Sequence, residues 1–150
     1  MNKQMAHLEI KNLCGPLPLA KTAYSGGQPT RAQLAELAGF HIGTVINLRP
    51  DSEMGDLDEA AVVSELGMAY RQISISDKTD LTRENVERFA TALNDSAPPL
   101  FIHCAGGNRV GALVALMAFW LDQVSAERAL EMGIQSGLTG LREAVADRLR

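Results

Sequence analysis

Apolar residues follow two alternating patterns along this chain, short β-rich runs and longer segments with helical spacing. The β-rich runs predict strands at residues 42–48, 68–75 and 100–104, and the pattern at 68–75 indicates one partly exposed face. In the other segments apolar residues recur every three or four positions, and these segments lie at residues 31–38, 57–66, 83–94, 109–121, 125–135 and 138–149. Strand and helix alternate through the middle of the chain. We therefore expect an α/β fold with a central, mostly parallel sheet flanked by helices on both faces.

The ends of these segments carry residues that commonly begin or end helices. Thr30 and Thr82 precede two helical segments, and their hydroxyls can accept hydrogen bonds from the first N–H groups of a helix. Gly39 and Gly67 follow helical segments and predict where those helices end. The segment 24–29 contains serine, two glycines and proline, so it predicts a turn.

The composition is typical of a single domain. A chain of 150 residues with 46% hydrophobic content can form one core, and we interpret residues 1–150 as one domain. The net charge of -4 and the scattered basic residues argue against a nucleic-acid or anionic-membrane partner. No segment is long and apolar enough to span a bilayer, and residues 1–11 lack the apolar core of a signal peptide.

Cysteine and histidine usage adds further expectations. Only two cysteines are present, Cys14 and Cys104, which indicates a reducing compartment, and we expect a cytoplasmic location. His7 and His41 stand apart from other residues at metal-ligand spacing, so we expect no metal site. The glycine pairs lack the spacing of a nucleotide-binding loop, and we expect no cofactor.

The run from Leu100 to Gly111 is where the sequence indicates chemistry. An apolar strand ends at Cys104, a four-residue loop follows, and Arg109 opens a long apolar helix. This order places a thiol at the N-terminus of a helix, where free N–H groups and the helix dipole stabilise negative charge. The thiolate is the nucleophilic form of cysteine, and arginine offers a planar fork for two oxygens of a tetrahedral anion. We therefore interpret the loop as a nucleophile inside an anion-binding cradle.

Four stretches of the chain resemble those of the cysteine-dependent phosphatases of the dual-specificity and tyrosine phosphatase superfamily. The likeness is to the bacterial phosphatase-like domain also found in beta-lactamase hydrolase-like proteins, and the stretches are residues 24–30, 44–49, 103–113 and 137–141. The resemblance implies a tyrosine phosphatase-like fold. It also implies hydrolysis of phosphomonoesters, phosphotyrosine-type esters among them, through a phosphocysteine intermediate.

The resemblance assigns a role to each residue of the site. Cys104 is expected to attack phosphorus, and His103 to help keep the thiol ionised. Asp77 is expected to act as general acid and then as general base, with Asp80 as the competing candidate. The expected phosphate-binding residues are Ala105, Gly106, Gly107, Asn108 and Arg109.

Two features depart from the usual phosphatase loop. Four residues rather than five separate Cys104 from Arg109, and the shorter loop resembles that of rhodanese-type sulfurtransferases. Val110 stands where the superfamily commonly has serine or threonine, and valine has no hydroxyl to assist departure of the thiolate. Three functions stay open: a phosphatase, a sulfurtransferase that carries a persulfide on Cys104, and a non-catalytic anion-binding module.

Two charged residues outside the loop stand at the end of another predicted strand. Arg49 and Glu53 flank Pro50, where they either border the pocket or are solvated loop charges. The expected partner is a phosphorylated substrate, either a small molecule or a protein. The sequence gives no signal for the oligomeric state.

Overall fold

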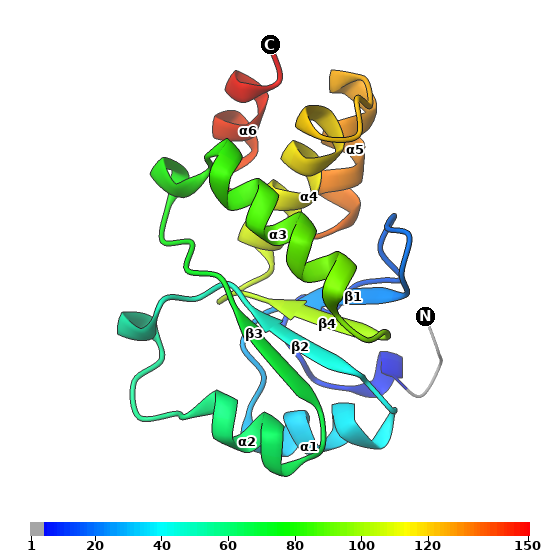
Figure 1. Ribbon diagram of the computed structural model, residues 1–150, viewed down its shortest axis with the longest axis vertical. Helices are drawn as coiled ribbons and strands as arrows, with labels where there is room; N and C mark the ends of the chain where they lie inside the picture. Colours follow the sequence, from blue (N-terminus) through cyan, green and yellow to red (C-terminus); the bar gives the residue numbers. More distant parts are fainter. Residues whose placement is uncertain (1–4) are drawn as a thin grey trace.

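Four parallel strands form the central sheet of the computed structural model, which describes residues 5–150 (Figure 1). The sheet order is β1-β4-β2-β3. The strands are β1 (Ala23–Gly26), β2 (Thr44–Asn47), β3 (Ala69–Gln72) and β4 (Leu100–His103). Because every pairing is parallel, all four carboxyl ends lie at the same edge of the sheet.

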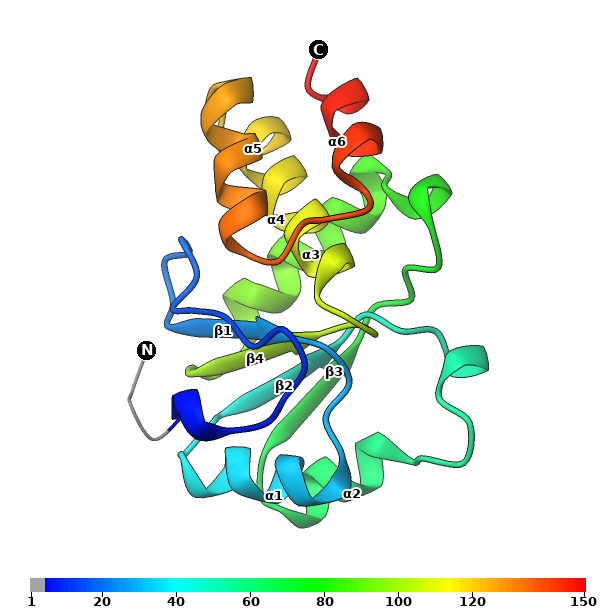
Figure 2. The same ribbon diagram turned by 180° about the vertical axis from the view of Figure 1, so that it is seen from behind.

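Helices cover both faces of this sheet, as Figures 1 and 2 show. One face carries α1 (Arg31–Gly39) and α2 (Glu59–Glu65). The other carries α3 (Arg83–Asp95), α4 (Asn108–Trp120), α5 (Ala126–Gln135) and α6 (Arg142–Arg148). Three 3-10 turns complete the described part of the chain: η1 (Met5–His7), η2 (Asp51–Glu53) and η3 (Lys78–Asp80). The predicted α/β class with helices on both faces is confirmed, and within residues 5–150 no helix has the length and apolarity that crossing a membrane requires.

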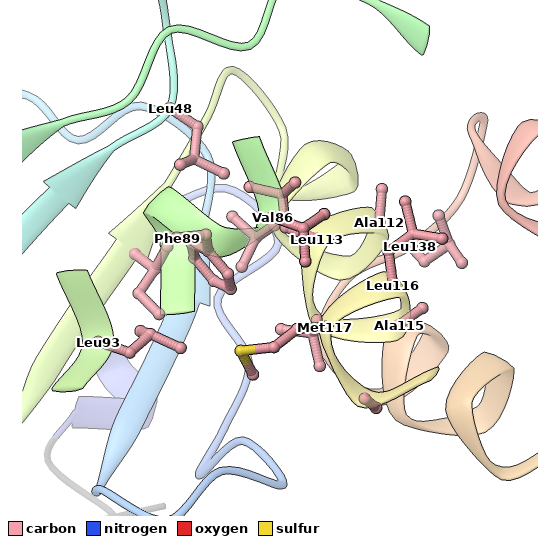
Figure 3. Close-up of a cluster of buried hydrophobic side chains, with 14 of the residues drawn as sticks. Leu48, Val86, Phe89, Leu93, Ala112, Leu113, Ala115, Leu116, Met117 and Leu138 are labelled. Carbon is pink, nitrogen blue, oxygen red and sulfur yellow. The ribbon is translucent and has the colours of Figure 1, made fainter. Parts of the chain in front are cut away.

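Strands β1, β2 and β4 are buried at every position, whereas the edge strand β3 is mostly exposed. Val45 and Phe101 pack with α1 and α2, while Ile46 and Ile102, the next residues along, pack on the opposite face. Helix α4 lies at the centre of the larger cluster (Figure 3), and each of its residues from 110 to 118 is buried. A helix surrounded in this way is fixed along its whole length, so the loop before it starts from a rigid position.

Several predicted ends are confirmed and others are corrected. Thr30 and Thr82 accept hydrogen bonds from Gln33 and Asn85 as the N-caps of α1 and α3. The segment predicted as a turn contains β1, which the sequence does not show because four residues of mixed character become a strand only by pairing with β4. The strands predicted at 42–48 and 68–75 are shorter than expected, although the Ile73 and Ile75 N–H groups still donate to the Asn47 and Leu48 carbonyls beyond β3.

Candidate active site

Strand β4 delivers Cys104 to the carboxyl edge of the sheet. Cys104 directly follows the strand and is 1% exposed, and its Sγ accepts a hydrogen bond of 3.0 Å from the Gly107 N–H. Gly107 is the N-cap of α4 with φ +91°, a left-handed conformation that glycine adopts without strain. The sulfur therefore lies at the N-terminus of a buried helix, where backbone N–H groups stabilise an anion.

Three consecutive carbonyls of the loop accept hydrogen bonds from outside it. The carbonyls belong to Cys104, Ala105 and Gly106, and the groups facing them are His103 Nδ1, the Gln28 N–H and Asn12 Nδ2, at 3.2, 3.2 and 2.9 Å. In a trans peptide the N–H points away from the preceding carbonyl. The next three N–H groups therefore point toward the other side of the loop, where that of Gly107 meets the sulfur. The loop has the form of an anion-binding nest.

The side chain of Asn108 has a structural role. Its Oδ1 accepts hydrogen bonds from the Thr139 and Leu141 N–H groups, at 2.9 and 3.1 Å. Gly137 packs against the same loop, since a Cβ there would lie 2.7 Å from the Gly107 oxygen. The segment that joins α5 to α6 therefore supports the loop from outside.

Arg109 is held by a carboxylate and a carbonyl. Nη1 donates to Glu53 Oε2 and to the Ile75 carbonyl, at 2.9 and 2.7 Å, and Nη2 donates to Glu53 Oε1 at 2.9 Å. These bonds leave the Nε–H and one Nη2–H, which together form the second edge of the guanidinium fork. Burial alone would lower the pKa of Arg109, but the Glu53 carboxylate and the nearby sulfur of Cys104 outweigh burial and raise it. The bonds from Arg109 in turn lower the pKa of Glu53.

The two charged residues beside Pro50 belong to this site. Arg49 Nε donates to Glu53 Oε1 at 3.3 Å, and Arg49 Nη2 donates to the Glu53 carbonyl at 2.6 Å. Arg49 Nη1 also donates to Gln28 Oε1 at 2.8 Å. Of the two sequence interpretations, the structure shows contact with the site residues rather than solvated loop charges.

A buried contact between His103 and Glu59 completes the polar contacts around the loop. His103 Nε2 lies 2.7 Å from Glu59 Oε2, and Gln28 Nε2 donates to Glu59 Oε1. Hydrogen bonds thus join six side chains into one chain of contacts, which runs from the start of the loop to its end. We call it the polar chain, and its members are His103, Glu59, Gln28, Arg49, Glu53 and Arg109.

The two candidate acids lie on the segment that passes Arg109. The Ile75 carbonyl accepts from Arg109, and Asp77 follows two residues later. Asp77 is fully exposed, and its Oδ1 accepts from the Thr79 N–H and hydroxyl, at 2.8 and 2.6 Å. The bond from the Thr79 hydroxyl, followed by that from its N–H, lowers the pKa of Asp77. Asp80 instead accepts from the Ser76 N–H at 2.7 Å. Both carboxylates shape the segment, and the choice between them as general acid stays a prediction.

Sequence reasoning missed three residues that hold the loop, namely Asn12, Gln28 and Glu59. Asn12 lies 94 positions from its loop partner and Glu59 lies 44 positions from His103, so no local spacing points to either contact. Glu59 follows the N-cap Asp58 and reads like an ordinary acidic residue of a first helical turn. Only its burial, with 2% of the residue exposed, distinguishes it.

A parallel sheet with a cysteine at its carboxyl edge, followed by a helix with an arginine in its first turn, is typical of the tyrosine phosphatase-like class of α/β domains. The model of the family described as DSP-PTPase phosphatase fused to NAD+ kinase matches residues 16–146. The chain belongs to this phosphatase family.

The chain is also similar to known proteins and solved structures. The chain is similar to the beta-lactamase hydrolase-like protein of Agrobacterium fabrum, with 32% identity over 94 residues, which cover 60% of this chain and 22% of that protein. It therefore matches about a fifth of the length of that curated relative. Among solved structures, a DUF442 protein of Shewanella putrefaciens has a TM-score of 0.69 and 25% identity, over 94% of this chain and 92% of that one. TpbA of P. aeruginosa, solved in complex with pTyr, has a TM-score of 0.60 and 18% identity, over 93% and 83%.

Proposed function

We propose that this protein is a cysteine-dependent phosphatase that hydrolyses phosphomonoesters, phosphotyrosine-type esters among them. The observation that carries the proposal is the position of the Cys104 sulfur. It lies at the start of α4, accepts the Gly107 N–H, and is close enough to Arg109 to raise the pKa of the guanidinium. Inward N–H groups and a guanidinium edge are the donors that three phosphoryl oxygens require.

The reaction proceeds in two steps. In the first, the Cys104 thiolate attacks phosphorus; the S–P bond forms, the P–O bond to the alcohol breaks, and Asp77 gives its proton to the leaving oxygen. In the second, water attacks the phosphocysteine, Asp77 takes a proton from it, and the S–P bond breaks. The products are the alcohol and inorganic phosphate, and the thiolate is regenerated.

Arg109 and the loop divide the binding of the phosphoryl group. The Nε–H and the second Nη2–H of Arg109 bind two oxygens, because Glu53 and Ile75 occupy the rest of the guanidinium. The N–H groups of residues 105–108 bind the equatorial oxygens from the other side. Asp77 reaches the leaving oxygen after releasing Thr79, since that contact holds its carboxylate ionised.

A second candidate function is sulfur transfer through a persulfide on Cys104. The four-residue spacing between Cys104 and Arg109 favours it, because a smaller ring of amides has less room for three phosphoryl oxygens. Sulfur transfer also needs no general acid, so Asp77 would be dispensable for it. The two candidates therefore differ in their response to the same variant.

The test assays the purified protein with an aryl phosphate and a phosphotyrosine peptide, and separately with thiosulfate plus cyanide. The proposal expects phosphate release that Cys104→Ser abolishes and Asp77→Asn strongly reduces. Cys14→Ser is the matched control, because Cys14 is the other free thiol and contacts Ser25 instead of the loop. Thiocyanate formation without phosphate release would replace the proposal by the second candidate.

A further measurement addresses access to the buried sulfur. Iodoacetate should alkylate Cys104, and inorganic phosphate should protect it by occupying the loop. If Cys104 resists alkylation in the folded protein and neither assay shows turnover, the proposal of catalysis fails. Phosphate binding without turnover would then leave an anion-binding module.

A further inference from the structure

Glu59 is a buried carboxylate with no part in the reaction just described. Its side chain is 1% exposed, and its two oxygens face His103 and Gln28. Burying a charged pair contributes little to stability compared with apolar residues of similar size. Stability therefore does not explain why a carboxyl group is buried at residue 59, and we ask which group Glu59 holds in position.

The contact made by the other ring nitrogen of His103 supplies that explanation. Nδ1 lies 3.2 Å from the Cys104 carbonyl, and a carbonyl can only accept, so this hydrogen bond needs a proton on Nδ1. Nε2 faces Glu59, which either accepts a hydrogen bond from the imidazolium as a carboxylate or donates one to the neutral ring as a protonated carboxyl. In both arrangements Nδ1 keeps its proton. Phe101 stacks on the ring, with centroids 5.8 Å apart, and fixes its plane.

We propose that Glu59 is a positioning residue for the phosphatase reaction, acting through His103 on the peptide between Cys104 and Ala105. The hydrogen bond from Nδ1 holds the Cys104 carbonyl on the outside of the loop, so the Ala105 N–H points inward. That N–H is the first of the inward donors and the nearest in sequence to the nucleophile. Without Glu59, a neutral His103 is free to move its proton to Nε2, and Nδ1 then repels the carbonyl.

The activity part of the test rests on the proposed function and compares two substitutions of Glu59. Glu59→Met removes the hydrogen bond to His103 Nε2. The kcat for an aryl phosphate should then fall about tenfold or more, because the loop N–H donors move from the positions that the transition state needs. In Glu59→Gln the amide NH2 can donate to Nε2 and keep the proton on Nδ1. This variant should therefore recover most of the lost activity.

Asp58→Ala is the matched control. Asp58 caps the same helix by accepting from the Ala61 N–H at 3.2 Å, and it makes no contact with His103. The control should lower Tm and leave kcat unchanged. Glu59→Met as active as the control would overturn the proposal, and so would Glu59→Gln as impaired as Glu59→Met, because the charge alone would then matter.

Two measurements need neither turnover nor a folded Glu59→Met variant. Nitrogen NMR of the His103 ring in the unmodified protein should show a proton on Nδ1, and an unprotonated Nδ1 overturns the proposal. Inorganic phosphate should shift the Ala105 N–H signal in the unmodified protein and in Glu59→Gln. If the unmodified protein has no phosphatase activity but passes both measurements, the proposed function fails, and Glu59 and His103 then position the Ala105 N–H for anion binding alone.

Discussion

Replacing Glu53 by glutamine tests whether this carboxylate holds Arg109. Glu53 accepts two N–H bonds of 2.9 Å from Arg109 and one of 3.3 Å from Arg49. In Glu53→Gln the carbonyl keeps one bond to Arg109, whereas the amide NH2 faces a second donor and cannot accept. A hydrogen bond to a charged group contributes about 1.5–3 kcal/mol. Because the Glu53 side chain is 30% exposed and screened by solvent, we expect a loss of about 1–2 kcal/mol.

Thermal unfolding and steady-state kinetics measure this loss. For a chain of this size the expected decrease in Tm is about 2–8 °C, and kcat/KM for an aryl phosphate should fall about tenfold or more because Arg109 loses its orientation. Glu84→Gln is the control, since Glu84 pairs with Arg88 at 2.8 Å on an exposed face of α3. The control should change stability by less than about 0.5 kcal/mol. If Glu53→Gln matches the control in both measurements, Glu53 does not hold Arg109.

The stabilisation by Glu53 also has a defined dependence on pH. The hydrogen bond from Arg109 is the main reason that the pKa of Glu53 is lowered in the folded protein. Such a group stabilises fully above its unfolded-state pKa, and the stabilisation is lost as pH falls through the folded-state pKa. The difference in Tm between the unmodified protein and Glu53→Gln should therefore be constant near neutral pH and shrink below about pH 4. A difference that grows on acidification would refute the reasoning.

Three further substitutions test the loop and the acid segment. Gly111→Ala should lower the free energy of unfolding by about 1–3 kcal/mol in urea titrations, because its Cβ would lie 2.1 Å from the Leu138 nitrogen. Thr79→Val should raise the pKa of Asp77, since the Thr79 hydroxyl is the main cause of its lowering; NMR titration of the carboxyl checks this. With Asp77 as general acid, the alkaline limb of kcat/KM, which reports the free enzyme, then moves to higher pH. Val110→Thr should speed hydrolysis of the phosphocysteine, and an unchanged burst in rapid-mixing experiments would show that the hydroxyl has no such effect.

The part of the fold that carries the nucleophile could be predicted because its signals are local. The apolar run 100–103 becomes β4, and the uncharged segment after Arg109 becomes α4, buried on most of its faces. The caps Thr30 and Thr82 were predictable for the same reason, since a cap contacts a residue three positions away. Strand β1 was not, because Tyr-Ser-Gly becomes a strand only through its partner β4.

The supporting residues of the site could not be predicted because their contacts join distant positions. Glu53 stands 56 positions from Arg109, and its sequence neighbourhood identifies only a charged loop. Glu59 and Gln28 meet through side chains that belong to α2 and to the segment after β1. A hydrogen bond between side chains has no period along the chain. The sequence therefore indicated the nucleophile and the anion cradle, and the structure supplied the groups that hold them.

The hydrogen bonds of the polar chain position the site residues more than they stabilise the fold. Two of its members, His103 and Glu59, are almost fully buried, and a pair of apolar residues there would contribute at least as much to the free energy of unfolding. The six members instead form one chain of contacts, and its two ends, His103 and Arg109, flank the loop. Such a network is satisfied only when every member is in place. The separation of the sulfur from the guanidinium is therefore set by side chains from several elements, and the four-residue loop does not have to set it alone.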